Sequence, residues 1–337
     1  YASLIGTKRC LATTNGTMAL VTALDALEVG VGDEVLVGPY TFIASVNAIF
    51  AVGALPIFVD TDPETFLVDP GLMEAKITPN TRGILPVHIN GLPVDMGRVN
   101  AIAKKHNLVV VEDACQAWMS GLEGQKCGSL GDLGCFSFQN SKNFTCGEGG
   151  AVTGNDDAVM DRAYSFHNFG IAYNEPAPRK GQAVRLGMKC RMSEYQAAIL
   201  MAQMTRLEEQ TQRRWENAQH LSSRLREVPG IAPARLNEGV TCVSYYKYPF
   251  RFQSERFDGV KREQFMRALR AEGVPCSSPR AVPLNLQPFF ENVLTSRNFK
   301  RMYSQQQLNY CREQNHCPAN EKLCAETVVL SQRLLLG

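Results

Sequence analysis

The sequence predicts an α/β protein in which a mainly parallel β-sheet is covered by helices and is followed by a smaller α+β C-terminal domain. Apolar strand-like runs alternate with helix-like runs through the first half of the chain, which is typical of a parallel sheet with helical crossovers. Polar residues follow several of these strand-like runs directly, as they do at the ligand-binding edge of open sheets. With 337 residues, 45% of them hydrophobic, the chain is long enough for a large core and a second domain.

The first strand and helix indicate an anion site. Residues 9–13 are expected to form a short strand, and Asn15-Gly16-Thr17 leads directly into a run with helical spacing from Met18 to Leu27. The free N–H groups of that first turn, the partial positive charge of the helix start and the Thr17 hydroxyl are suited to a phosphate. The alternative is that Asn15 simply caps the helix.

The next strand is expected at residues 34–37. The glycines of Gly30-Val-Gly-Asp33 precede this strand, whereas the glycines of a dinucleotide-binding fingerprint follow a strand and open a helix, so that interpretation is rejected. A helix is predicted at 43–52, which places Phe42 at the end of a strand. Phe42 would either stack on a ligand ring or belong to the core.

The alternation continues as far as the Asp113 region. Strands are predicted at 54–59, 83–87 and 108–111, and helices near 70–75 and at 99–106. His88 and Asp113 then fall at the ends of two strands. The run Leu108-Val-Val-Val-Glu-Asp-Ala-Cys-Gln116 places two carboxylates and an amide where a buried strand ends. A carboxylate there needs a cation or donors beside it, and a protonated pyridine nitrogen is one suitable partner. The alternative is a helix cap or a surface ion pair.

Lys142 is the predicted functional centre. Phe136 and Phe138 alternate with Cys135 and Ser137 as in a buried strand, and the chain then enters a polar, glycine-rich loop that carries this lysine. A lysine that loses its water gives up its proton more easily, and a neutral amine can condense with a carbonyl. The alternative is an ordinary solvated loop lysine.

The second half of the chain predicts a separate smaller domain. A strand at 151–153 and a helix at 156–165 are followed by an irregular loop at 168–182 and by one long helix, or two, within 192–228. The predicted division is a large cofactor-binding domain at 1–228, including the long helix, and a C-terminal domain at 229–337. The latter is expected to hold strands within 240–252 and a helix at 262–272.

Several classes of function are disfavoured. The net charge of +2 has no basic cluster behind it, which argues against a nucleic-acid or polybasic membrane surface. No apolar run is long enough to cross a bilayer. The eleven cysteines form no CxxC pair and the five histidines no i,i+4 pair, so neither a metal site nor a disulfide framework is expected, and the cysteines are typical of a reduced, cytoplasmic protein. The common hydrolase and nucleotidase motifs are absent.

Three motifs in combination resemble the DegT/DnrJ/EryC1/StrS sugar aminotransferase family. They are Asn15-Gly-Thr17, Asp113-Ala-Cys-Gln116, and Phe136-Ser-Phe-Gln-Asn-Ser-Lys142-Asn with Gly147-Glu-Gly-Gly150, and further similar stretches include Arg191-Met-Ser-Glu-Tyr-Gln-Ala-Ala198. The resemblance runs along nearly the whole chain. It implies the aspartate-aminotransferase fold (fold type I), pyridoxal 5′-phosphate (PLP) as cofactor, and a cytoplasmic homodimer with active sites at the subunit interface. Family members usually extend beyond both ends, so the chain is expected to be a fragment lacking both termini.

The resemblance also implies roles for single residues. Lys142 would bind PLP as a Schiff base and move a proton, and Asp113 would pair with the pyridinium nitrogen. Phe42 would stack on the cofactor ring, and Gln116 would contact the 3′-oxygen side of that ring. Gly16, Thr17 and Ser137 would hold the phosphate. Lys189 stands where the family usually has an asparagine that reaches the partner subunit's phosphate, so this contact is expected either to be taken over by an ammonium or to be lost.

The implied reaction moves an amino group from glutamine or glutamate to a nucleotide-linked keto sugar or an inosose-type cyclitol ketone. Within the family, the motif Phe-Gln-Asn-Ser-Lys that ends at Lys142 favours the aminocyclitol branch. One alternative is a PLP-dependent sugar dehydratase of the same family, in which histidine replaces the lysine, so the presence of Lys142 argues against it. The other alternative is a non-catalytic regulatory protein with this fold, which the intact Lys142 and Asp113 disfavour.

Overall fold

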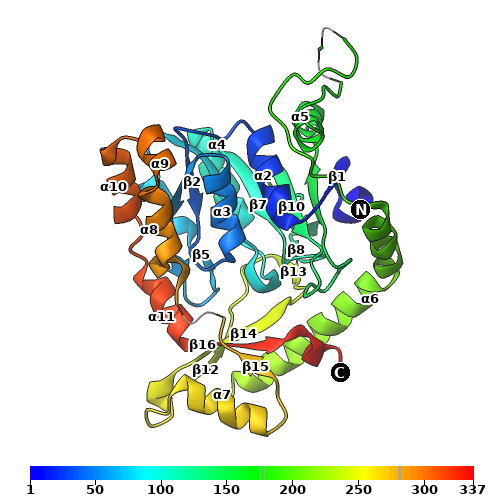
Figure 1. Ribbon diagram of the computed structural model, residues 1–337. Helices are drawn as coiled ribbons and strands as arrows, with labels where there is room; N and C mark the ends of the chain where they lie inside the picture. Colours follow the sequence, from blue (N-terminus) through cyan, green and yellow to red (C-terminus); the bar gives the residue numbers. More distant parts are fainter. Residues whose placement is uncertain (175, 178, 280–281) are drawn as a thin grey trace.

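The structure is a computed structural model that describes residues 1–174, 176–177, 179–279 and 282–337. A large sheet with helices on both faces forms the main body, and a second, smaller sheet lies below it in Figure 1. The long helix α6 (Glu194–Leu225) runs from the main body to this second sheet.

The large sheet has seven strands in the order β1-β11-β10-β7-β6-β2-β3. Pairing is parallel from β10 to β3, whereas β11 is antiparallel to both of its neighbours, so the sheet is mainly parallel as predicted. The strands are β1 (Arg9–Thr13), β2 (Glu34–Val37), β3 (Leu55–Phe58), β6 (Thr81–Leu85), β7 (Val109–Asp113), β10 (Leu133–Ser137) and β11 (Gly150–Gly154).

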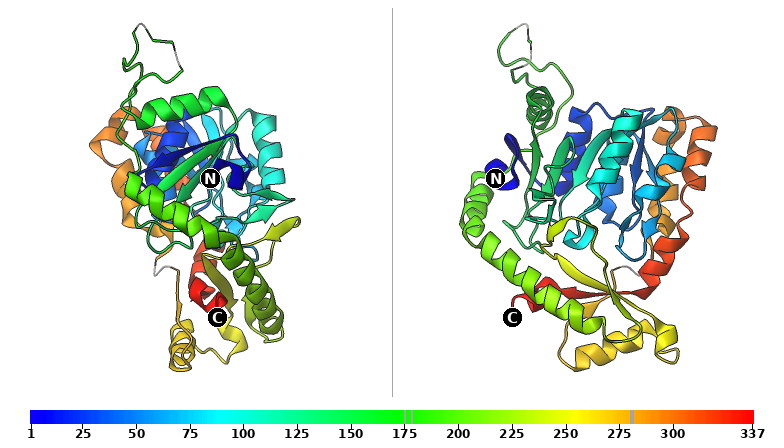
Figure 2. Two further views of the ribbon diagram at one scale, coloured as in Figure 1. Left: turned by 90° about the vertical axis from the view of Figure 1, so that its right-hand side faces the viewer. Right: turned by 180° about the vertical axis from the view of Figure 1, so that it is seen from behind.

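Helices cover both faces of this sheet because its strands are apolar on both sides. All residues of β2, β3, β10 and β11 are buried, which is the pattern of a doubly covered parallel sheet. Helices α2 (Gly16–Ala26), α3 (Ile43–Ala51) and α5 (Asp157–His167) lie on one face, and α4 (Met96–His106) lies on the other (Figure 2).

The second sheet has four antiparallel strands in the order β12-β14-β16-β15. They are β12 (Ile231–Pro233), β14 (Lys247–Phe252), β15 (Cys276–Ser277) and β16 (Thr327–Ser331), with α7 (Arg262–Ala271) packed against β15. The division of the chain at residues 228 and 229 stays a prediction, although this sheet begins shortly after that point.

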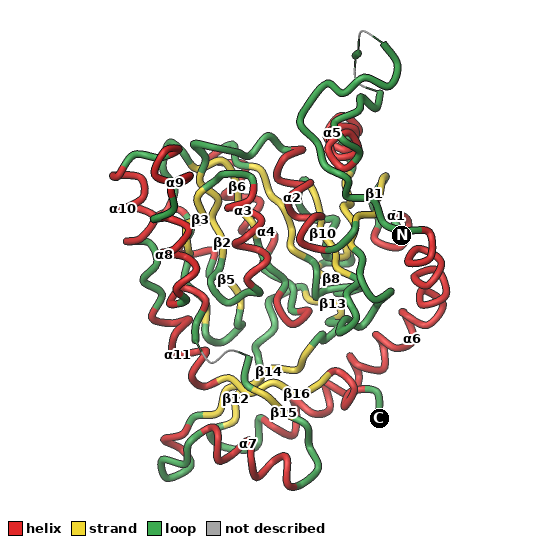
Figure 3. Tube along the Cα trace, viewed as in Figure 1, coloured by secondary structure: helices red, strands yellow, loops and turns green. Residues whose placement is uncertain are grey.

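Part of the C-terminal segment returns to the main body (Figure 3). The rings of Phe50 and Phe58 pack on Phe290 at 5.6 and 5.2 Å between centroids, and the Tyr303 hydroxyl donates to the Gly53 carbonyl at 2.6 Å. The helices of this segment are α8 (Pro288–Leu294), α9 (Arg297–Met302), α10 (Gln305–Glu313) and α11 (Pro318–Glu326). The shorter elements are α1 (Ala2–Ile5), β4 (Thr61–Asp62), β5 (Leu67–Val68), β8 (Gly121–Leu122), β9 (Gln125–Lys126) and β13 (Val240–Cys242).

Helix α6 is continuous over 32 residues, so the long apolar pattern belongs to one helix and not two. Its start is fixed by a capping box in which Ser193 and Gln196 satisfy each other's backbone N–H groups. The helix predicted near 70–75 is wrong: two 3₁₀ turns occupy Pro70–Leu72 and Glu74–Lys76, the first capped by Asp69. Strand β6 begins at Thr81, two residues before its predicted start. In the loop predicted at 168–182, residues 175 and 178 lie outside the described residues.

Candidate functional site

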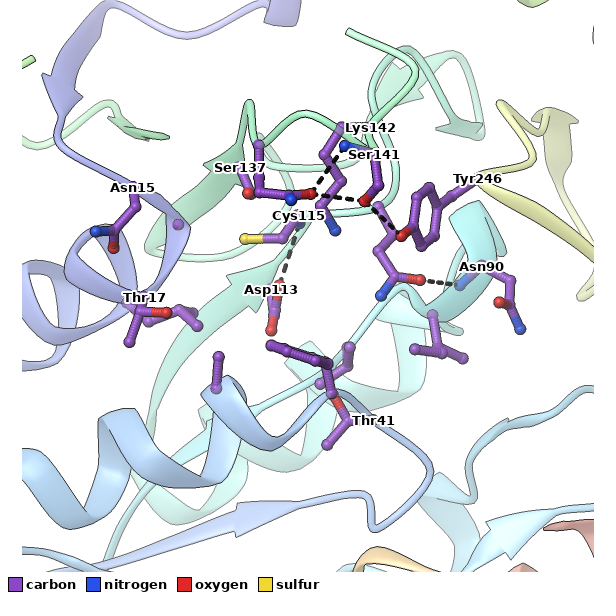
Figure 4. A pocket seen from close by; sticks show the side chains of 18 of the residues that line it. Asn15, Thr17, Thr41, Asn90, Asp113, Cys115, Ser137, Ser141, Lys142 and Tyr246 are labelled. Atoms are coloured by element: carbon purple, nitrogen blue, oxygen red, sulfur yellow. Dashed lines mark hydrogen bonds between the residues drawn. The ribbon is translucent and has the colours of Figure 1, made fainter. Parts of the chain in front are cut away.

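A cavity of about 710 Å³ opens at the carboxyl ends of the parallel strands. A volume of this size is typical of small-molecule sites and leaves room for a cofactor together with a substrate. Figure 4 shows the start of α2 on one side of the cavity, Tyr246 on the other, and Asp113 and Lys142 between them. Of the eight predicted site residues, seven line it: Gly16, Thr17, Phe42, Asp113, Gln116, Ser137 and Lys142.

Asp113 is the last residue of β7 and is 5% exposed. Its Oδ2 accepts a hydrogen bond from the Ser45 hydroxyl at 2.7 Å, and its Oδ1 accepts from the Cys115 N–H at 3.1 Å. A further hydroxyl, that of Thr41, lies 2.7 Å from Ser45 Oγ. Two donors therefore hold the carboxylate at the cavity wall, and the helix-cap and surface-pair alternatives for Asp113 do not describe it.

The Cys115 thiol beside Asp113 remains protonated. Its burial and the negative charge of Asp113 raise its pKa well above the ordinary value. A neutral thiol is a weak nucleophile, so the cavity wall here offers the carboxylate and not a thiolate.

The turn from β1 into α2 provides the anion-binding groups. The side chain of Asn15 accepts the Met18 N–H at 2.9 Å, so Asn15 does cap the helix. The N–H groups of Gly16 and Thr17 come earlier in the first turn and have no intrahelical acceptor by the geometry of a helix start. Capping and anion binding are thus compatible at this turn, because they use different N–H groups.

Gly16 keeps this turn close to Ser137 at the end of β10. A Cβ atom at position 16 would stand 2.6 Å from Ser137 Cβ and 2.9 Å from Cys115 Sγ. The missing side chain therefore allows the backbone of the helix start to approach the Ser137 side chain. Together these groups form a cradle whose donor chemistry fits a phosphate.

Lys142 lies in the loop after β10 and is half-buried in the cavity wall. Its backbone N–H donates to the Gln139 carbonyl at 2.9 Å, which fixes a tight turn. Its Nζ lies 4.4 Å from the centroid of the Tyr246 ring and 5.7 Å from that of Trp118. This lysine faces two aromatic rings in a cavity, so the solvated-loop alternative does not describe it.

Gln116 and Phe42 line the same cavity. The Gln116 Oε1 accepts the Asn90 N–H at 2.8 Å, which orients the side-chain amide of this buried residue. Phe42 stands at the N-cap of α3 and is 59% exposed, so its alternative assignment to the core is wrong. The ring is available for a planar ligand.

Two polar residues that were predicted at strand ends, His88 and Glu112, do not line the cavity. His88 is completely buried, its Nδ1 accepts the Val94 N–H, and its Nε2 lies 2.9 Å from Glu112 Oε2. Glu112 also accepts N–H groups from the 128–131 turn, at 2.6 to 2.8 Å. Of the two adjacent carboxylates, Glu112 therefore holds a turn in place and Asp113 faces the cavity.

Lys189 does not line the cavity of this chain. It is exposed and forms an isolated antiparallel bridge with Asn168. Its contact with a phosphate of another subunit remains a prediction.

Four further residues that shape the site were not predicted from the sequence. Ser45 supports Asp113 from α3, Tyr246 contacts Lys142 from the segment before β14, and Asn90 and Lys247 also line the cavity. They come from segments far from residues 113 and 142 in the chain, so only the tertiary fold brings them together.

Within the part of the chain that the structure describes, no group of three or more His, Cys, Asp or Glu side chains could hold a metal ion. All eleven cysteines lie in that part and are free thiols. None of its helices combines the length and the apolar character that a membrane span needs.

The described residues fit PLP on chemical grounds: an amine for an aldehyde, a buried carboxylate for a ring N–H, and a helix-start cradle for a phosphate. Comparison with known proteins agrees with this fit. A model of the DegT/DnrJ/EryC1/StrS aminotransferase family matches residues 1–330.

Among curated proteins, the chain is 33% identical to an L-glutamine:2-deoxy-scyllo-inosose aminotransferase of Streptoalloteichus tenebrarius, over 100% of this chain and 80% of that protein. It is 37% identical to a GDP-perosamine synthase of Caulobacter vibrioides, over 88% of this chain and 78% of that protein. For other inosose aminotransferases that it matches, the alignment spans about two thirds of their length, 64% for that of Micromonospora echinospora.

Solved structures show the same fold. A 3-amino-5-hydroxybenzoic acid synthase superposes with a TM-score of 0.86 at 30% identity, covering 100% of this chain and 84% of the other. NtdA from Bacillus subtilis, solved with bound cofactor PMP, has a TM-score of 0.78 at 28% identity, covering 98% of this chain and 70% of the other. The predicted fold is confirmed by these likenesses.

Proposed function

The chain belongs to the DegT/DnrJ/EryC1/StrS family of PLP-dependent aminotransferases, and from this premise we propose that it transfers an amino group from L-glutamine or L-glutamate to a keto sugar or an inosose. The observation that carries the proposal is the meeting of Lys142, Asp113 and the helix-start cradle in one cavity.

When bound, PLP supplies an aldehyde carbon that takes up the amino group and a protonated ring that withdraws electrons from the reacting carbon. Lys142 would hold it covalently, and Asp113 would accept the ring N–H. The phosphate would lie in the cradle of Gly16, Thr17 and Ser137. Gln116 would contact the 3′-oxygen, and Phe42 would cover one face of the ring.

In each half-reaction Lys142 would act as base and acid. In the first half-reaction, once the donor's amino group has displaced Lys142, the freed amine would take the proton from the donor's α-carbon and would deliver it to the carbon that had been the cofactor aldehyde. In the second half-reaction the same proton transfer would run in reverse, onto the acceptor. The Tyr246 and Trp118 rings lie beside the Lys142 amine, at 4.4 and 5.7 Å from its Nζ, and so help to hold it in the cavity wall. Asp113, anchored by Ser45, would keep the ring nitrogen protonated throughout.

Several relatives support an inosose or keto-sugar acceptor. Two are named as aminotransferases that use L-glutamine and an inosose, and a third as a GDP-perosamine synthase. We therefore propose glutamine as the preferred donor and a cyclitol ketone or a nucleotide-linked keto sugar as the acceptor. The presence of Lys142 argues against the dehydratase alternative.

We also propose that the chain functions as a homodimer in the cytoplasm. Large apolar side chains are exposed close together in sequence, on the segment before α6 and on its first turns: Leu186, Met188, Tyr195, Ile199 and Met201. A hollow of about 170 Å³ lined mainly by apolar side chains, including Met201 and Met204, adjoins them. Such an exposed apolar surface is typical of a protein–protein interface. Lys189 directly follows Met188, so a second copy bound to this surface would lie close to the segment of Lys189. The eleven free thiols are typical of a reducing compartment.

The test is a transamination assay. Protein loaded with PLP is incubated with glutamine or glutamate and a panel of 3-keto and 4-keto nucleotide sugars beside scyllo-inosose, and products are detected by mass. We expect one acceptor to gain an amino group. Light scattering on the same sample measures the oligomeric state, for which we expect a dimer. No aminated product from any acceptor, with cofactor bound, would contradict the proposed activity.

A further inference from the structure

We infer that Lys247 and Tyr246 form a subsite for an anionic oxygen group of a substrate, and that this group is the carboxylate of the amino donor. The inference rests on the proposed transamination and deepens it, because it names residues that recognise the donor.

Lys247 brings a second ammonium group to the cavity wall. It is the first residue of β14, and antiparallel pairing with Ser331 fixes its backbone. Its half-buried side chain lines the same cavity as Lys142. Lys105 and Lys322 form ion pairs with glutamates on the surface, whereas no described carboxylate lies within ion-pair distance of Lys247. A partly desolvated ammonium without a counter-ion favours an anionic ligand.

Tyr246 fixes the position of this ammonium relative to the reacting amine. Its backbone N–H donates to the Asn90 carbonyl at 2.9 Å, and its hydroxyl lies 2.9 Å from the Ser141 hydroxyl. Its ring centroid lies 4.4 Å from Lys142 Nζ and 5.9 Å from Lys247 Nζ. Both lysine nitrogens are therefore close to one aromatic ring that is held in place.

The closeness of the two lysine nitrogens to one ring suits an amino acid. In an amino donor the carboxylate is bonded to the carbon that carries the amino group, so a donor reacting at Lys142 brings its carboxylate to the immediate surroundings of that lysine. The start of α2 lies on the opposite side of the cavity from Tyr246 (Figure 4), and under the proposed function its cradle would hold the cofactor phosphate. The Lys247 side is thus the part left for substrate, and a charge-assisted hydrogen bond from its ammonium would orient the donor.

The first measurement is binding without reaction. Glutarate, which has the carboxylates of glutamate but no amine, is titrated by calorimetry into the PLP-loaded protein. We expect Lys247→Met to weaken glutarate binding about 10- to 100-fold, on the scale of one charge-assisted contact. Lys247→Arg, which keeps the charge, should recover most of the affinity. Lys104→Met, on the exposed side of α4, is the matched control and should bind as wild type does.

The second measurement separates donor from acceptor. The glutamine concentration that half-saturates conversion of the bound cofactor should rise by a similar factor in Lys247→Met, while PLP affinity and the KM for the acceptor stay close to wild type. Unchanged glutarate and glutamine constants would overturn the inference. So would a rise confined to the KM of a diphosphate-bearing acceptor, since Lys247 would then serve a phosphate. A wild-type protein that converts no donor would instead contradict the proposed function.

Discussion

Asp113 is held by two donors before any ligand contacts it. The Ser45 hydroxyl and the Cys115 N–H each donate a hydrogen bond to one carboxylate oxygen, at 2.7 and 3.1 Å, and the Asp113 side chain is almost completely buried. Its remaining acceptor capacity faces the cavity, where a ring N–H would lie. Under the proposed function, the charge of this side chain would keep the cofactor ring protonated.

We expect Asp113→Asn to keep the fold and to lose one to three orders of magnitude in turnover, at roughly 1.4 kcal/mol per order. The amide can accept a hydrogen bond but has no charge with which to stabilise the pyridinium proton. Steady-state assays and circular dichroism of the two proteins measure the effect. Near-normal turnover with a protonated ring would exclude the assigned role.

Ser45→Ala removes one of the two donors of Asp113 without touching the cofactor. We expect PLP to bind about 5-fold more weakly, the equivalent of about 1 kcal/mol for one hydrogen bond. The pH at which the bound cofactor changes its absorbance should shift as well, because the Asp113 carboxylate loses the hydrogen bond that Ser45 donates to it. Ser45→Thr retains the hydroxyl and should restore both values; an alanine variant that titrates like wild type would show that Ser45 is only structural.

For single residues, the sequence predicted the candidate reactive groups but not the residues that support them. Asp113 was predictable because it ends an apolar strand, and Lys142 because it follows another. Ser45, 68 positions before Asp113, looks like any polar residue of a helix until the fold brings the two together. The sequence also could not distinguish the adjacent carboxylates of Glu112 and Asp113, of which the first holds the 128–131 turn and the second faces the cavity.

Among the secondary-structure elements, the turn from β1 to α2 would determine where the phosphate is held under the proposed function. The start of α2 is pressed against Ser137, with no room for a Cβ at residue 16. The motif predicted the strand, the turn and the helix, because local spacing and turn residues decide these. The closeness of β10 could not be predicted, because it depends on the strand order of the sheet.

Gly16→Ala should therefore weaken PLP binding by at least 10-fold, since the new methyl group displaces the cradle from Ser137. Gly97→Ala is the matched control: it also lies in the first turn of a helix, and its Cβ would meet its nearest neighbour at an ordinary 3.5 Å. PLP titration followed by absorbance compares the two. Equal affinities in Gly16→Ala and wild type would show that the cradle does not hold the phosphate.

At the scale of the whole molecule, alternation and length predicted the mainly parallel sheet and the second, smaller sheet. The return of α8 to α11 onto the main body was not predicted, because ring contacts such as that of Phe50 with Phe290 leave no periodic signal. Lys189, exposed and outside the cavity of its own chain, is the residue through which a contribution of a second subunit to the cavity can be tested.

If Lys189 reaches the phosphate of the partner's cofactor, Lys189→Met should weaken PLP affinity roughly 10- to 100-fold, at 1.4 kcal/mol per decade. PLP titrations of the wild-type and variant proteins at matched pH measure this affinity. Identical affinities would mean that the lysine points into solvent and that the phosphate is held by the cradle of its own chain.

Borohydride reduction followed by peptide mapping tests whether Lys142 is the amine that holds the cofactor. The protein is loaded with PLP, reduced, digested and analysed by mass spectrometry, with Lys142→Ala treated in parallel. We predict that the reduced cofactor adds its mass to the peptide containing Lys142 in the wild type and to no peptide in the variant. Stoichiometric labelling of another lysine, with Lys142 unmodified, would contradict this role of Lys142.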